Sequence, residues 1–400
     1  MRISTNLVFE RGRNALTEQQ GALSEQQLRI ASGKKYLSPA EDPSAAVQSL
    51  SLTRAIEATQ QFVRNGTMAE ARLSSQESVL GQVNENLQRV RELTIQAANA
   101  SQTEDTRGDI AAEIEQRLGE LLDLANTRDA NGEYIFAGFQ SGQRPFTPTA
   151  TGVLFNGDSG ERFVAVSPER EVRVGDSGRR LFMELPAGNG TFEVAADPGN
   201  TGAGIIETGS VLDAGAWTGD DYTIEFTAED RFTVRDGGGA VVAADVPYLA
   251  DAAITAVPGI EFTIEGAPAA GDRFTIAPAG EQPLFETYRE LIGALRGPST
   301  QTADAARFQT TINRVLTAFD GASASTLDAR ADLGARLRSI ESQRAINEDL
   351  VLNYERTRSE VDDLDYAEAI TRFQQQLTAF QAAQASFARI QQLSLFDFLR

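Results

Sequence analysis

The sequence of 400 residues contains no histidine and no cysteine. Without imidazole or thiol side chains, a protein cannot build a Ser-His-Asp or Cys-His nucleophile set, and it cannot form the usual zinc or haem sites. An enzyme of this composition would have to work with carboxylates, arginine, tyrosine and hydroxyl groups. We therefore expect a protein that is not an enzyme and that uses no metal and no cofactor.

Three segments weakly resemble known binding or catalytic sites, but each lacks residues that such a site needs. The glycine-rich segments 188–190 and 202–204 lack the helix and lysine that follow in a phosphate loop. The acidic cluster 360–368 has no central glycine, so a solvated face or a helix start explains it better than a calcium loop does. A paired-carboxylate glycosidase is conceivable in the acid-rich middle of the chain, but nothing in the sequence selects a pair.

Long apolar runs are also absent. No segment approaches 18 consecutive apolar residues, and the N-terminal stretch has neither an apolar run of signal-peptide length nor a small-residue cleavage site. We therefore expect no membrane contact and no cleaved secretory signal. A formal net charge of −21 predicts repulsion from a phosphate backbone, so we expect no nucleic-acid partner.

What the sequence does contain is an apolar repeat of seven residues at both ends of the chain. Such a repeat places one apolar seam along a helix, and the seam is stable only when it packs against a partner. Glutamines flank both seams. The seams consist of Phe9, Leu16, Leu23, Ile30 and Leu37 near the N-terminus and of Tyr366, Ile370, Phe373, Leu377, Phe380 and Phe387 near the C-terminus.

We expect these seams to be an assembly surface, paired with each other or with neighbouring copies. A seam that closes only within one molecule is the open alternative. The charge distribution suits assembly, because residues 146–280 hold 21 Asp and Glu against 8 Arg, whereas residues 364–400 carry equal numbers of acidic and basic residues. Self-repulsion is thereby kept away from the ends.

Two long helices are predicted between the seams. No proline occurs from Ser44 to Ser101, so this run predicts one helix of roughly 85 Å at 1.5 Å per residue. A second long helix is predicted from Thr326 to Val361, and we expect the two to lie antiparallel as a coiled-coil rod. Shorter helices are predicted at 110–125 and 284–295. The apolar stripe of the second long helix is Leu333, Ile340, Asn347, Tyr354 and Val361.

The middle of the chain has a different composition. Residues 146–280 contain 20 of the 34 glycines and 8 of the 13 prolines, and apolar residues alternate there, as at Tyr222, Ile224 and Phe226. This pattern predicts an inserted all-β domain. Before it, the pair Asn131–Gly132 predicts a β-hairpin over 129–136. The fold class is therefore α+β, with a helical rod built from N- and C-terminal segments and a β insertion.

The sequence resembles the bacterial flagellin superfamily at both ends. The resemblance lies in the opening residues 1–5, in segments 29–35 and 41–46, and in the ending 391–399. Asp42–Pro43, the stretch 124–138 and the ending Ser-Leu-Phe-Asp-Phe-Leu favour the junction proteins of this superfamily, which join hook to filament, over its filament subunits. We include Leu395 and Phe396 of that ending among the expected assembly residues.

The resemblance implies a structural protein of the bacterial flagellum. It implies a terminal assembly domain (1–37 and 364–400), a helical rod domain (38–145 and 281–363) and the insertion (146–280). It further implies ring-like self-assembly, a neighbouring hook-associated protein on the hook side, filament subunits on the distal side, and an export chaperone that binds the C-terminal region. The protein would be extracellular and secreted without a cleaved signal. A filament subunit and an intracellular coiled-coil scaffold are the open alternatives.

Overall fold

The computed structural model describes residues 5–99, 101–298 and 302–397. These residues form two compact units, one from residues up to 64 and from 343 onward, the other from residues 65–342. Two long helices, α2 (Pro43–Ala98) and α5 (Thr302–Asp362), contribute to both units. The proline-free run from Ser44 therefore forms one helix, as predicted, and the second long helix starts well before Thr326. No helix in the described part of the chain is long and apolar enough to cross a membrane.

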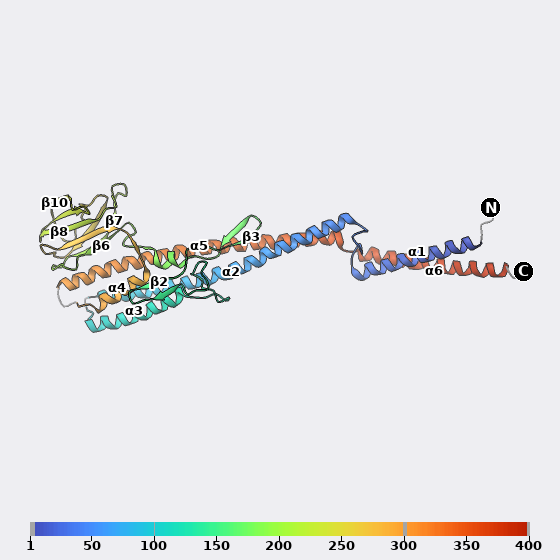
Figure 1. The fold of residues 1–400 in the computed structure, drawn as a ribbon, viewed down its shortest axis with the longest axis horizontal. Helices are drawn as coiled ribbons and strands as arrows, with labels where there is room; N and C mark the ends of the chain where they lie inside the picture. The colour runs from blue at the N-terminus through green and yellow to red at the C-terminus, as the bar shows by residue number, and fades with distance from the viewer. Residues whose placement is uncertain (1–4, 100, 299–301, 398–400) are drawn as a thin grey trace. The chain divides into compact units, whose positions relative to one another are not determined.

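The first unit contains only helices among its described elements. Besides the first part of α2 and the last part of α5, it consists of α1 (Thr5–Ser32) and α6 (Tyr366–Asp397). α1 and α6 run side by side (Figure 1). The breaks that separate α1 from α2 and α5 from α6 lie at residues 33–42 and 363–365.

The second unit has a helical layer with a continuous core. α3 (Glu104–Ala125) and α4 (Leu284–Arg296) pack together and lie beside α2 and α5 (Figure 1). The predicted stripes are confirmed here, because Leu333 and Ile340 of α5 and Leu291 of α4 are fully buried. Asp320 pairs with Arg91 and Glu77 with Arg330, which sets α2 and α5 antiparallel.

Residues 146–186 are mostly not helical, but their apolar side chains pack into the same hydrophobic core as the helices of this unit. They form β1 (Phe146–Pro148) with β2 (Val153–Phe155), β3 (Phe163–Ser167) with β4 (Arg170–Arg173), a short π-helix (Arg179–Met183) and β5 (Leu185–Pro186). Phe146 and Phe182 lie 5.4 Å apart between ring centroids, and Phe146 is 5.4 Å from Phe285 of α4. This segment therefore completes the helical layer.

The remaining strands form a domain with its own core. A five-stranded antiparallel sheet has the order β10-β9-β8-β12-β6, and β7 pairs with β11 in a second sheet. The alternation at Tyr222, Ile224 and Phe226 is confirmed as a strand. The strands are β6 (Phe192–Ala196), β7 (Ile205–Val211), β8 (Tyr222–Ala228), β9 (Arg231–Asp236), β10 (Val241–Pro247), β11 (Ile260–Glu265) and β12 (Arg273–Pro278), and β13 (Glu281–Gln282) pairs with β5.

The segment 129–136 differs from the predicted hairpin. Gly132 adopts a left-handed φ of 81° and its amide donates to the Asp129 carbonyl, so the tight turn exists. Only the single pair Arg128 and Tyr134 forms a β-bridge, however. A longer ladder is absent because Ile135 and Phe136 turn into the helical core, where they are buried.

Candidate assembly surface

The two predicted seams meet each other in the first unit. Phe9 of α1 and Phe387 of α6 pack edge to face with ring centroids 6.1 Å apart. Gly12 makes this contact possible, because a β-carbon there would lie 2.7 Å from the Phe387 ring. Toward the other end of the pair, the Gln26 side-chain amide donates to the Ala369 carbonyl at 3.1 Å.

Pairing within one chain leaves the seams only half covered. Tyr366 and Ile370 are 51% and 44% exposed. Leu395 and Phe396 lie in α6, but their side chains are outside the described residues. The predicted residues that are half-buried are Phe9, Leu16, Leu23, Ile30, Phe373, Leu377, Phe380 and Phe387.

The first unit has almost no hydrophobic core. Among its described residues, Ile56 and Ala369 are the only buried hydrophobic side chains. All other buried hydrophobic side chains in the described part of the chain belong to the second unit. Because helix stability in water comes mainly from packing of an apolar face, the first unit is poorly stabilised by contacts within one copy.

The joint between α1 and α2 is held to the joint between α5 and α6 by backbone hydrogen bonds. The Leu364 amide donates to the Gly33 carbonyl at 2.9 Å, and the Lys35 amide donates to the Asp362 carbonyl at 2.9 Å. Gly33 has a φ of 69°, which ends α1 in a left-handed conformation that glycine adopts at little cost. The two helix breaks thus form one connected node.

Asp42 starts α2 at this node. Its Oδ1 accepts hydrogen bonds from the amides of Ser44 and Ala45, so Asp42 is the N-cap and Pro43 the first helical residue. Bonding from the Ala45 amide and then from the Ser44 hydroxyl lowers the pKa of Asp42, since both bonds favour the charged form. Burial, followed by the charges of Asp362 and Asp42, raises the pKa of the Tyr36 phenol.

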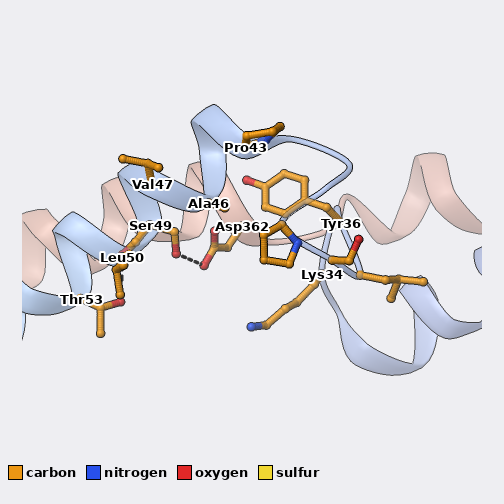
Figure 2. Close-up of a pocket in the computed structure, with 12 residues that line it drawn as sticks. Lys34, Tyr36, Pro43, Ala46, Val47, Ser49, Leu50, Thr53 and Asp362 are labelled. Atoms are coloured by element: carbon orange, nitrogen blue, oxygen red, sulfur yellow. Dashed lines mark hydrogen bonds between the residues drawn. The ribbon is translucent and has the colours of Figure 1, made fainter.

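An apolar groove of about 600 Å³ opens beside the node. Figure 2 shows residues that line this groove, among them Tyr36, Ser49 and Asp362. The Ser49 hydroxyl donates a hydrogen bond to the Asp362 carboxylate at 2.5 Å. Val47 and Leu50 also line the groove and are 70% and 52% exposed. Sequence reasoning missed these two residues because they lie outside the predicted heptad stripes; their spacing of three on one helix was the available signal.

Among the described residues, no group of three or more acidic side chains is arranged so that it could hold a metal ion. The surface that the first unit offers is instead apolar, elongated and made of helices. Such a surface suits contacts between proteins rather than binding of a small molecule.

Comparison with known proteins agrees with this geometry. The family model of the bacterial flagellin N-terminal helical region matches residues 3–141, and that of the C-terminal helical region matches residues 316–399. These regions define a flagellin-type protein. Flagellar hook-associated protein 3 of Escherichia coli (strain K12) is 26% identical over 397 residues, which is 99% of both chains.

A solved structure narrows the assignment further. The crystal structure of the flagellar junction protein FlgL from Legionella pneumophila is 32% identical, with a TM-score of 0.72 over 79% of this chain and 100% of that one. Flagellin of Salmonella rubislaw matches only 135 residues, 34% of this chain. The chain belongs to the family of flagellar hook-associated protein 3, the hook-filament junction proteins, and the predicted resemblance and function are confirmed.

Proposed function

We propose that the chain acts at the junction of hook and filament by assembling with copies of itself through its first unit, and that its role is mechanical rather than catalytic. The observation that carries this proposal is the missing core of that unit. Two buried hydrophobic side chains, Ile56 and Ala369, cannot stabilise four helical segments, whereas neighbouring copies would cover the half-exposed seams of α1 and α6.

The same surface supports the proposal of the partners that the resemblance implies. A neighbouring hook-associated protein would contact the assembly on the hook side and filament subunits on the distal side. The exposed apolar face of α6 is also the feature that an export chaperone would cover before secretion. We place the protein outside the cell, at the hook-filament junction. The filament-subunit alternative is less favoured because the flagellin match spans a third of the chain.

The experiment is complementation of a deletion strain with Leu23→Asp or Phe380→Asp. A charge placed in a seam that becomes buried on assembly costs several kcal/mol unless it is paired. We expect both variants to be secreted and to leave filament subunits in the medium instead of attached to cells. The matched control is Leu212→Asp, which changes an exposed leucine in the β domain.

Circular dichroism and thermal melting of the purified variants check that the second unit stays folded. Normal filaments in either seam variant would show that the seams are not the assembly surface. An equal loss of filaments in the Leu212→Asp control would show that the added charge alone, and not its position in a seam, causes the effect.

A further inference from the structure

α2 and α5 have different surroundings in the two units. In the second unit α3 and α4 lie beside them, and Leu73 and Leu80 of α2 are at most 1% exposed. In the first unit the only other helices among the described residues are α1 and α6, which are paired with each other. The stretches 43–64 and 343–362 therefore lack covering helices.

Both stretches carry exposed apolar side chains. Val47 and Leu50 form a patch on α2, which borders the groove in Figure 2. Ile346 and Leu350, four residues apart, form a patch on α5, where Ile346 is 51% and Leu350 is 38% exposed. We call these the α2 patch and the α5 patch.

The two patches lie at different heights along the helix pair. The Ser49–Asp362 hydrogen bond sets the antiparallel register of α2 and α5. The α5 patch therefore faces about residues 61–65, and at 1.5 Å per residue it is ~20 Å along the pair from the α2 patch. Two different patches at two heights are the arrangement that a staggered, head-to-tail contact requires.

The charges of the two stretches are complementary. Residues 43–64 carry two Arg and one Glu, whereas residues 343–362 carry five acidic residues and three Arg. An α2 stretch with net positive charge would be attracted to an α5 stretch with net negative charge in a neighbour, and two like stretches would repel each other.

We propose that the α2 patch of one copy packs against the α5 patch of a second copy of this chain. The α2 stretch of each copy is then covered by one neighbour and its α5 stretch by the other, as α3 and α4 cover the helix pair in the second unit. The contact is heterologous, so each copy has one neighbour on each side, and repetition builds a ring or a short helix. The proposal deepens the proposed function and rests on it only in taking the flagellum as the place of assembly.

The absence of natural cysteines allows a direct test by disulfide cross-linking. Ser51 is exposed one turn from Val47, and Asp349 is exposed between Ile346 and Leu350, so cysteines there leave both patches intact. We would express Ser51→Cys/Asp349→Cys in a deletion strain, oxidise isolated flagella mildly and separate the chains without reductant. A ladder of dimers, trimers and larger multimers is expected. The matched control, Ser51→Cys/Asp328→Cys, moves the second cysteine along α5 into the second unit and should give no ladder.

Each other outcome overturns the proposal. Products that stop at dimers show a two-fold contact. A cross-link to a different protein shows another occupant, and absence of cross-links in flagella with attached filaments shows that the patches do not meet. Independently of cross-linking, Leu50→Asp should release filaments while Leu327→Asp on α5 should not; filaments retained by Leu50→Asp also overturn it. If instead the chain is not needed for filament attachment at all, the proposed function fails and not this contact alone.

Discussion

Asp176 is a buried carboxylate that receives three guanidinium groups. Its side chain is 1% exposed, and its oxygens lie 2.8 Å from Arg336, 3.0 Å from Arg180 and 3.3 Å from Arg173. Arg336 belongs to α5, whereas the other two arginines flank Asp176 in the segment 146–186. This one residue therefore fastens that segment to the helical layer.

We predict that Asp176→Asn destabilises the second unit by about 3 kcal/mol, because it removes the buried charge on which the guanidinium groups of Arg173, Arg180 and Arg336 converge. Thermal melting of the purified variant measures the effect. The matched control is Asp320→Asn, which removes a surface ion pair with Arg91 and should cost under about 1 kcal/mol. Equal losses in the two variants would contradict a special role for Asp176.

At the level of elements, the sequence predicted the long helices but not how deeply each is buried. Leu73 and Leu80 in α2 are fully buried, whereas Leu16 and Leu23 in α1, with the same spacing, are half-buried. Spacing determines which side chains share a face. Whether other helices cover that face depends on contacts distant in sequence, which no local pattern reports.

The predicted insertion shows a similar limit. Glycine and proline content marked residues 146–280 as one β region, yet Phe146 and Phe182 pack with Phe285 in the helical core. Strand-like alternation is the same whether a strand packs on a sheet or on helices, so the sequence did not separate the two parts. The ends of the independent β domain are close together, since the Ala187 amide donates to the Gly280 carbonyl at 2.9 Å.

This arrangement predicts that the protein still folds when residues 188–279 are removed, but not when all of residues 146–280 are removed. Replacing residues 188–279 with a short Gly-Ser linker should preserve helical content and cooperative melting, because the helical core is untouched. Replacing 146–280 should prevent stable folding, since it removes several fully buried aromatic and aliphatic side chains at a cost of 3–5 kcal/mol for each aromatic ring. Circular dichroism on both purified variants decides between them. Two variants of equal stability would place the boundary at 146.

On the scale of the whole molecule, the second unit has its own hydrophobic cores, whereas the first unit has almost none among its described residues. Residues 65–342 hold two hydrophobic cores, one helical and one in the β domain. The first unit contains exposed apolar side chains in place of a core. A protein exported as separate chains and assembled afterwards would keep its assembly surface uncovered until neighbours arrive.

Amide hydrogen exchange, compared between the isolated chain and assembled flagella, tests this division most directly. Amides open locally where few apolar contacts hold a helix, so residues 5–64 and 343–389 should exchange quickly in the isolated chain and slowly after assembly. Residues 65–98 and 302–342, on the same helices α2 and α5, serve as the internal control and should be protected in both states. Strong protection of α1 and α6 in a chain shown to be monomeric would contradict the proposal that neighbouring copies complete the first unit.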